Sequence, residues 1–375
     1  MKVAELTFEE FLNYKTEWCE ALERSGDNHI FLTWEWLSTW WKHFGGERRF
    51  SLITVSDDEK LIAAAPLMSS KYKLAGLKLK KMEFIGTPAA DYQTFLLADK
   101  KTECAKLIMD YASNKTSSWD CIEFKDVPED SETIKILKTC SRKKLEFEER
   151  NVNICPYIIL PNRFEDYFQE LGPNWRRNMR RWGKKLKNDY RVNFYIHNDL
   201  DTLDEAMETF FNLHQIKWQS QKHAGVFSDQ RFHDFHLEVA KSFAERGWLN
   251  LCFLAINDEP VSAIYAFKYR NKMFNYLTGF DPKYSEYRLG HLLFLYSIKN
   301  SIEHGLTEFD FMRGDETYKR RWNTLIRNNL EVRAIKKRIV PIVYDIITKK
   351  NMFTPLATTL GKRVSFAPKE ILRKE

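Results

Sequence analysis

The sequence has few of the features that mark a membrane, secreted or metal-binding protein. Its longest apolar stretch, Leu289 to Ile298, is interrupted by Gly290 and His291 and is roughly half the length that a bilayer-spanning helix needs. The six cysteines form no C-x2-C pair, and a chain of 375 residues is long enough to fold without disulfide bonds. We therefore expect reduced, mostly buried cysteines and no metal site. The first residues contain no apolar core of a signal peptide, so we expect a cytoplasmic protein.

The composition is that of a folded chain with more than one domain. Hydrophobic residues make up 43%, charged residues 30% and aromatic residues 14%, and the aromatics are spread along the whole sequence, which excludes disorder. At roughly 100–200 residues per domain, the length predicts two or three domains. The net charge of +7 is modest for this size.

Positive charge is concentrated between residues 176 and 191. This stretch has one acid, Asp189, and the following eight bases: Arg176, Arg177, Arg180, Arg181, Lys184, Lys185, Lys187 and Arg191. A second basic region follows Arg333. A local patch of one sign indicates an anionic partner such as a phosphate, a nucleic acid or a lipid headgroup, or else a helix face turned to solvent. Both interpretations stay open on the sequence alone.

Two segments of the chain follow the same order of expected elements. In the first half a hairpin precedes a helix over 103–111, a strand over 121–124 and an acidic loop over 126–130. In the second half a hairpin precedes a helix over 288–304, a strand over 308–312 and a charged loop over 313–316. The sequence therefore predicts an α+β protein with two copies of one unit, each a mixed twisted sheet flanked by helices.

The stretch from residue 272 to 322 carries most of the chemistry. A strand ends at Gly279-Phe280, and Gly290 then opens a helix, where a phosphate can approach the free N–H groups and the positive end of the dipole. A strand that follows ends in a dense polar cluster, Arg313 to Lys319. Asp315 or Thr317 could simply cap the next helix, but a cap does not need an arginine, a tyrosine and a lysine beside it.

The run GFDPKYSEYRLGHLLF, followed by EFDFMRGDETYKRRW, resembles the Acetyltransferase-6 family of the GNAT superfamily, also called BioF2-like or CelD-like. The resemblance spans about residues 20–325, and its D-F-x-R-G-D-x-x-Y-K-x-x-W part is specific. The family is similar to the Fem-type peptidyltransferases, which are two GNAT-like domains in tandem with a basic helix at the place of residues 174–181. The resemblance implies an acyltransferase enzyme built from two GNAT-like units.

The resemblance also implies that the two units bind different substrates. Residues 1–161 would form a first unit without a cofactor site, which binds the acceptor through Asp91 and Tyr92. Residues 162–340 would form a second unit with the acyl-donor site, and residues 341–375 a basic tail that we expect to be helical. The donor would be acetyl-CoA or another acyl-CoA, used without a metal.

In GNAT enzymes the donor lies along a splayed strand, here 275–280, and its pyrophosphate sits on the next helix N-terminus. Only one glycine of the usual R/Q-x-x-G-x-G/A signature is present. The donor-binding residues implied in this way are Phe280, Arg288, Leu289, Gly290 and His291.

Acyl transfer to an amine requires a base, because the amine is protonated at neutral pH. The candidates are Asp315 and His214, with a backbone N–H of the splayed strand stabilising the oxyanion. His214 could instead be a satisfied helix histidine, and Asp315 a cap paired with Arg313. Arg313 and Lys319 would hold an anionic acceptor group or the thioester carbonyl. Residues expected to bind substrate besides Asp91 and Tyr92 are Tyr318, Arg176 and Arg180.

Three functions remain open at this point. The first is an N-acyltransferase that uses acyl-CoA and a small-molecule, glycan or peptide amine, which the family resemblance places in cell-envelope or polysaccharide biosynthesis. The second is a Fem-like transferase that uses aminoacyl-tRNA, with RNA phosphate on the basic helix. The third is a non-catalytic module whose basic face docks to nucleic acid or peripherally to a membrane. The sequence does not identify the acceptor, the acyl length or the oligomeric state.

Overall fold

The computed structural model of the chain describes residues 1–74, 76–114, 119–140, 147–336 and 341–346. The described residues divide into two compact units. Unit 1 consists of Met1–Asn153 together with the described residues between Asn328 and Ile346, and unit 2 consists of Ile154–Arg327. The sequence suggested boundaries after residues 161 and 340. The chain instead passes between the units within two long strands, β7 (Glu148–Ile159) and β13 (Leu325–Ile335), so no linker marks the change. Residues 341–346 are helical, and the rest of the expected tail lies outside the described residues.

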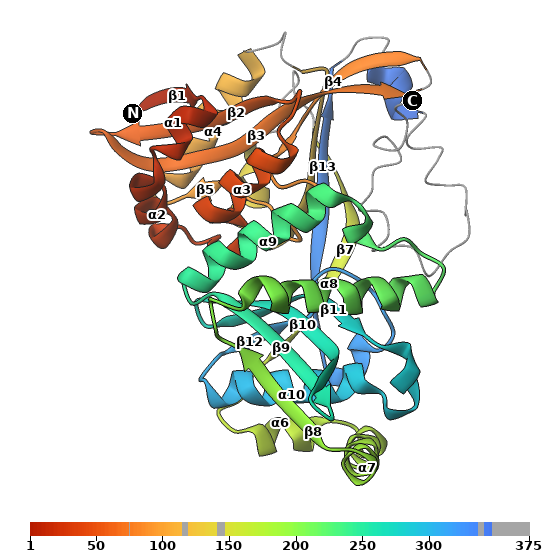
Figure 1. Cartoon of the computed structure of the whole chain (residues 1–375). Coiled ribbons are helices and arrows are strands. Elements are labelled where there is room, and N and C mark those ends of the chain that lie inside the picture. Colours follow the sequence, from red (N-terminus) through yellow and green to blue (C-terminus); the bar gives the residue numbers. More distant parts are fainter. Residues whose placement is uncertain (75, 115–118, 141–146, 337–340, 347–375) are drawn as a thin grey trace. The chain divides into compact units, whose positions relative to one another are not determined.

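Unit 1 contains a mixed sheet in the order β1-β2-β3-β4-β6-β13, with β5 paired to β3 (Figure 1). Its pairs are antiparallel except β4–β6, where Lys81 lies opposite Cys121 and Met82 opposite Ile122. The strands are β1 (Lys2–Leu6), β2 (Arg49–Asp57), β3 (Lys60–Leu74), β4 (Leu77–Phe84), β5 (Leu96–Leu97) and β6 (Cys121–Pro128).

The helices of unit 1 cover this sheet and bury its core. Apolar residues of β2, β3, β4 and β6 pack with α4 and α5 in one cluster. The helices are α1 (Phe8–Leu12), α2 (Lys15–Arg24), η1 (Ile30–Leu32), α3 (Trp34–Phe44), α4 (Lys101–Asn114) and α5 (Glu132–Cys140). The Thr7 hydroxyl and the Glu10 carboxylate close a capping box at the start of α1, which explains why this short helix begins there.

Unit 2 contains a second mixed sheet in the order β7-β12-β11-β10-β9-β8. The meander β8–β11 is antiparallel, and β11 runs parallel to β12, as β4 does to β6 in unit 1. The strands are β8 (Val192–His197), β9 (Leu249–Ile256), β10 (Glu259–Tyr269), β11 (Lys272–Phe280) and β12 (Glu308–Asp310). The α+β class and the two mixed sheets flanked by helices that the sequence predicts are therefore confirmed.

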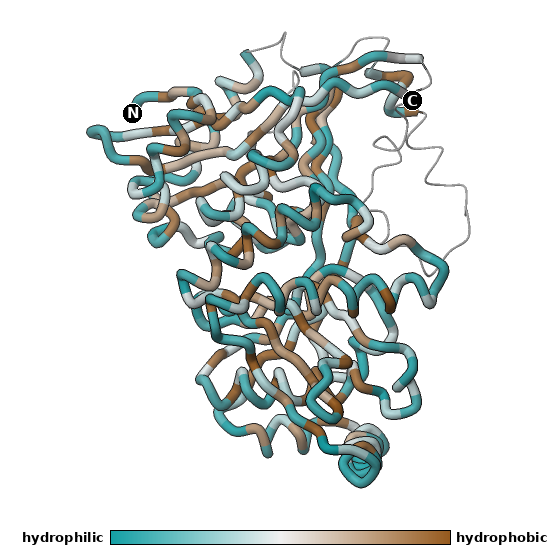
Figure 2. Tube along the Cα trace, viewed as in Figure 1, coloured by the Kyte–Doolittle hydropathy of each residue, from teal (hydrophilic) through white to brown (hydrophobic). Residues whose placement is uncertain are grey.

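Helices cover both faces of the unit 2 sheet. One hydrophobic cluster joins α7 and α10 to one face of β9, β10 and β11, while aromatic residues of α8 and α9 pack on the other face. Figure 2 shows hydrophobic residues along the central strands and a largely hydrophilic α7. The helices are α6 (Phe164–Glu170), α7 (Pro173–Asp189), α8 (Leu203–Ser220), η2 (Val226–Ser228), α9 (Gln230–Glu245), η3 (Pro282–Tyr287), α10 (Leu289–Glu303) and η4 (Lys319–Trp322).

Candidate functional site

Strands β11 and β12 separate soon after they meet. Their parallel register covers only three pairs and ends where Phe274 lies opposite Asp310, whereas β11 continues for six residues to Phe280. A β-bulge shifts the pairing of β11 with β10 between Leu277 and Asn275. The stretch 275–280 therefore has a strand neighbour on one side and, among the described residues, no pairing with β12 on the other.

The helix that follows this strand presents an open N-terminus. Arg288 takes the left-handed conformation (φ 55°) at the N-cap of α10, and no side chain caps the helix. A Cβ added at Gly290, the second residue of α10, would meet no atom within 4 Å. The first turn of a 15-residue helix thus has free space beside it and a positive dipole end, which is the setting in which helices bind phosphate.

Aromatic rings surround the next residue of α10, His291. Its ring lies 4.9 Å from the ring of Trp175 and stacks on Trp182 at 5.9 Å, both centroid to centroid. The rings of Trp322 in η4 and of Tyr318, which precedes η4, lie 6.2 and 6.0 Å away. Burial, and then the positive charges of two nearby arginines, Arg321 and Arg288, lower the pKa of His291 from 6.5 to about 4. The imidazole is therefore neutral at pH 7.

Several buried polar atoms around this helix end lack a hydrogen-bond partner. They are Nδ1 of His291, Nε1 of Trp175, Nε1 of Trp322 and both polar atoms of the Asn275 amide, and they find none among the described residues. Asn275 is wholly buried at the point where β11 and β12 separate. Native proteins leave few such groups unsatisfied, and each indicates a water or a ligand that completes it. The unpaired strand, the open helix end and these atoms fit a donor with a polar, phosphate-bearing chain.

Lys319 holds the loop after β12 from inside. Its ammonium group is wholly buried and donates to the carbonyls of Met312, Arg313 and Gly314 at 3.0, 3.1 and 3.3 Å, and it pairs with Glu316 at 2.9 Å. Met312 has φ 59°, a strained value for a bulky residue. This geometry gives Lys319 the task of fixing the loop, and the substrate contact expected for it stays a prediction.

The same loop carries the first candidate base to the surface. Asp315 has a side chain 47% exposed, and one of its oxygens, Oδ1, accepts two bonds from Arg320, at 2.7 and 3.1 Å. The ion pair expected with Arg313 is thus formed with Arg320. Arg313 itself is half-buried, and the Tyr318 ring stacks on Phe294 at 5.6 Å, between centroids. The Asp315 carboxylate is therefore accessible to solvent.

The second candidate base, His214, is buried in α8. Its Nε2 accepts a hydrogen bond from the indole N–H of Trp218 at 2.8 Å, so a neutral ring carries its proton on Nδ1. A Cβ at Gly279 of β11 would come within 2.5 Å of the His214 backbone nitrogen, so only glycine allows this approach. The helix therefore lies directly against the unpaired end of β11, but His214 must release Trp218 before it can accept a proton.

Four other residues were expected to bind substrate, two of them in unit 1 and two on α7. Asp91 and Tyr92 are buried in unit 1, where the Asp91 carbonyl accepts a bond from Asn329 at 2.7 Å and Tyr92 packs against His29 and Phe31. Arg176 donates to backbone carbonyls before α7, one of them that of Leu171 at 3.0 Å. Arg180 lies over Phe168 at 5.2 Å from the ring centroid. Their roles with a substrate stay predictions.

The aromatic surroundings of the helix end were not among the expected site residues. Trp175 and Trp182 come from the basic helix α7, and Arg321 and Trp322 come from η4, with the Arg321 guanidinium 5.3 Å from the Trp175 ring centroid. The spacing of Trp175, Met179, Trp182 and Leu186 places one apolar stripe on α7. That stripe shows that α7 packs inward, but nothing in the sequence says that it packs on α10.

These features together define a GNAT-type acyltransferase fold. Residues 173–320 match the family described as Acetyltransferase (GNAT) domain. The resemblance to this family that the sequence shows is confirmed over these residues. No curated protein sequence matches the chain.

Solved structures with the same fold cover nearly the whole chain. FemX has a TM-score of 0.63 at 12% identity, over 92% of this chain and 100% of its own. L-PGS from Bacillus licheniformis has a TM-score of 0.55 at 12% identity, over 89% and 96%. A conserved protein of unknown function from Bacteroides thetaiotaomicron has a TM-score of 0.55 at 11% identity, over 90% and 100%. At such identities the likeness concerns the fold alone.

The described residues contain neither a membrane-spanning helix nor a metal-binding cluster. No helix there is both long and apolar enough to cross a bilayer. No group of three or more histidine, cysteine, aspartate or glutamate side chains there is arranged to hold a metal ion.

Proposed function

We propose that this protein is an N-acyltransferase that moves an acyl group from an acyl-CoA to an amine. The observation that carries the proposal is the open N-terminus of α10 beside the unpaired stretch of β11. Gly290, Arg288 and Arg321 would hold the donor phosphates, and Asn275 and the free N–H groups of 275–280 would hold the acyl arm. The thioester would supply an activated acyl group.

The chain's own residues would then prepare the amine. Asp315, exposed at the end of the loop that Lys319 fixes, is the better placed base, because the acceptor nitrogen of His214 is already bonded to Trp218. A carboxylate in this position would take a proton from the ammonium form of the acceptor, directly or through water. The aromatic rings around His291 would keep water away from the donor phosphates.

Isothermal titration with CoA and acetyl-CoA tests the donor site. Gly290→Glu puts a carboxylate into the free space of the first turn, where phosphate would bind, while its effect on the helix itself is favourable. We expect saturable binding to the wild type that weakens at least tenfold in Gly290→Glu. Lys299→Gln is the matched control, because it changes the charge of the same helix by the same amount at an exposed site. No binding to the wild type at millimolar CoA would overturn the proposal.

The exposed face of α7 favours a second candidate, a transferase that takes its acyl group from aminoacyl-tRNA. Five cations on this face, Arg177, Arg180, Arg181, Lys184 and Lys187, have no acidic partner among the described residues, and all are exposed. The face starts beside the α10 N-terminus, because Trp175 and Trp182 of α7 contact His291. A donor with many phosphates could continue from that helix end along α7.

A salt titration of tRNA binding tests this second candidate. Affinity should fall steeply with salt, and the double variant Arg181→Gln/Lys184→Gln should bind more weakly with a shallower salt slope. Lys71→Gln/Lys73→Gln removes the same charge from two exposed positions near the end of β3 in unit 1 and should leave binding unchanged. Absence of tRNA binding, or equal loss in both variants, would contradict the second candidate.

A further inference from the structure

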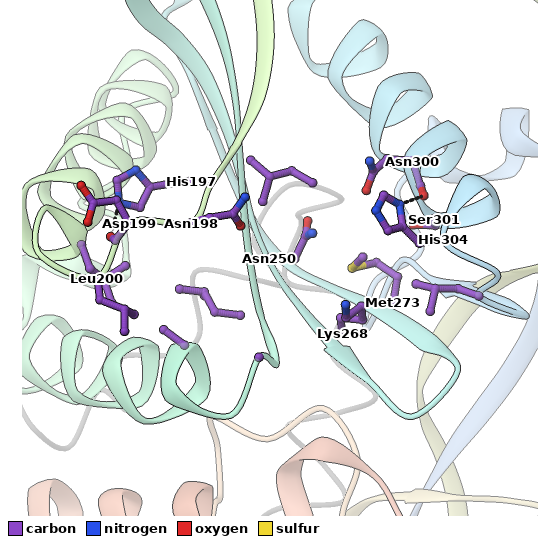
Figure 3. A pocket seen from close by; sticks show the side chains of 16 residues that line it. His197, Asn198, Asp199, Leu200, Asn250, Lys268, Met273, Asn300, Ser301 and His304 are labelled. Carbon is purple, nitrogen blue, oxygen red and sulfur yellow. Dashed lines mark hydrogen bonds between the residues drawn. The ribbon is translucent and has the colours of Figure 1, made fainter.

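A cavity of about 270 Å³ lies in unit 2 at the end of α10 that is remote from the candidate donor site (Figure 3). It is bounded by the β8–α8 connection, the start of β9 and the last turn of α10. Gly290 and His304 are fourteen residues apart on α10, a separation of about 21 Å at 1.5 Å per helical residue. A molecule in this cavity therefore cannot touch a group reacting at the α10 N-terminus.

The cavity combines planar polar side chains with an apolar floor. Asn198, Asn250 and Asn300 come from three different elements and border the same space in Figure 3. Leu203, Leu249, Met273 and Leu306 supply the apolar part of its lining. Amides donate and accept hydrogen bonds at one edge, so such a lining suits a small ligand with hydroxyl or amide groups on one side and C–H groups on the other.

Asn250 is the strongest indication that the cavity takes a ligand. Its side chain is 7% exposed, and the amide forms no hydrogen bond with the residues that the structure describes. Burying an amide without a hydrogen-bond partner costs free energy. The part of the Asn250 side chain that stays exposed faces the cavity. Asn250 lies in β9, and the cavity borders its side chain.

The charges around the cavity cancel. Lys268 contributes one positive charge and has no acidic partner among the described residues, and Asp199 contributes one negative charge. The Asp199 carboxylate is already occupied, because Thr202 Oγ1 and the Asp201 N–H donate to it at 2.9 and 3.0 Å. His197 Nε2 and His304 Nδ1 each donate to a backbone carbonyl at 2.8 Å. This balance distinguishes the cavity from the cationic α10 N-terminus and disfavours a phosphate.

We propose that this cavity is a second, non-catalytic binding site for a neutral polyhydroxylated molecule of about the size of one sugar ring. The Asn250 and Asn198 amides bind its hydroxyl or amide groups, and the leucine and methionine side chains pack against its C–H face. The site is independent of the donor site, so it does not require that the protein transfer an acyl group.

Ligand-observed NMR with the full chain tests the proposal, with glucose and N-acetylglucosamine as the neutral probes and inorganic phosphate as the charged one. We expect saturable binding of at least one sugar and no competition by phosphate. Asn250→Leu and Asn198→Ala should each weaken binding about tenfold, the effect of losing one good hydrogen bond. Asn193→Ala on the exposed face of β8 is the matched control and should bind as the wild type does.

Two pocket variants are compared so that misfolding of one variant cannot be mistaken for a loss of binding. Asn198 is exposed, so its truncation leaves the core intact, and thermal unfolding of both variants followed by circular dichroism shows whether the chain is still folded. Binding that persists in both variants, or absence of sugar binding at tens of millimolar, would overturn the proposal. Phosphate binding that displaces the sugar would show an anion site instead and would overturn it as well.

Discussion

The two units differ in what lies beside the short parallel strand pair of their sheets. In each, an antiparallel meander leads into a strand that pairs with a parallel neighbour over only two or three residues, β4 with β6 and β11 with β12. In unit 1 the connecting chain fills the gap that follows: the Gln93 backbone N–H donates to Asp126 at 2.9 Å, and its side-chain amide donates to Lys125 at 3.3 Å. In unit 2 no described strand pairs with β11 on its β12 side beyond the short contact with β12. Lys217 of α8 donates to the Thr278 carbonyl at 3.2 Å, and the buried Asn275 amide has no hydrogen-bond partner among the described residues.

Buried lysines show the same contrast. Lys81 of unit 1 lies between the carboxylates of Glu83 and Glu123, both at 2.9 Å, so its charge is neutralised within the sheet. Lys319 of unit 2 donates to three loop carbonyls and so shapes a charged loop at the edge of the gap. In unit 1 a buried ionic cluster lies at the parallel strand pair. In unit 2 the two parallel strands separate, and β11 continues without pairing to β12. For this reason we place the donor in unit 2 alone.

The largest expected effect comes from breaking the ionic core of unit 1. Burial raises the pKa of Glu123, but Lys81, Lys125 and Arg333 outweigh it and hold that pKa well below its usual range. Lys81→Met leaves Glu83 and Glu123 short of their shared cation, so the free energy of unfolding should fall by about 3–5 kcal/mol in urea denaturation. Lys78→Met, at an exposed site of the same strand, is the control. Equal losses in both variants would refute the closed core.

Removing the buried lysine of unit 2 should lower the free energy of unfolding somewhat less than Lys81→Met does. Lys319→Met leaves three carbonyls and Glu316 without their donor, and we expect a loss of about 2–4 kcal/mol in the free energy of unfolding. Lys299→Met on the exposed side of α10 serves as the reference. An unchanged stability together with a loss of activity would instead mean that Lys319 acts on the substrate and does not position the loop.

Acid should weaken unit 2 through His291. Its pKa of about 4 in the folded chain lies below the ordinary 6.5, so the unfolded chain binds the proton more readily. The stability associated with the neutral ring is complete above pH 6.5 and is lost as the pH falls toward 4. Between pH 7 and pH 5 the wild type should lose about 2 kcal/mol more than His291→Phe, measured by urea unfolding at both pH values. Parallel pH curves for the two proteins would show that His291 is not buried as described.

The smallest expected effect concerns the bond between Trp218 and His214. Trp218→Phe removes the indole N–H that donates to His214 and should lower the free energy of unfolding by about 1 kcal/mol. Trp248→Phe is a fair comparison, because its indole N–H makes no hydrogen bond with the described residues. If His214 is nevertheless the base, Trp218→Phe will shift the pH profile of turnover; an unshifted profile supports Asp315.

Much of the fold could be predicted from the sequence, because hydrophobic periodicity and helix-ending glycines agree with the tertiary structure. The meander of unit 2 and the end of α10 at Gly305, with φ 71°, lie where periodicity and the glycine place them. Strand β13 runs from Leu325 to Ile335, and its partner strand β6 comes from a distant part of the chain. No local pattern reports such partners.

The site was less predictable than the fold. The sequence marks Gly290 and the loop after β12 as polar and unusual, and the structure places them at strand and helix ends. It does not reveal that the Lys319 ammonium points inward to carbonyls, that Asp315 pairs with Arg320, or that Trp175 reaches His291. These contacts depend on packing between elements far apart in the chain, which spacing alone does not encode.

Counting donor sites tests the central claim, that only unit 2 takes the donor, most directly. Acetyl-CoA would be titrated into the wild type, Gly290→Glu and Thr102→Glu, since Thr102 is the second residue of α4 as Gly290 is of α10. We predict one site per chain, lost in Gly290→Glu and unchanged in Thr102→Glu. Two sites per chain, or a single site lost in Thr102→Glu and kept in Gly290→Glu, would contradict it.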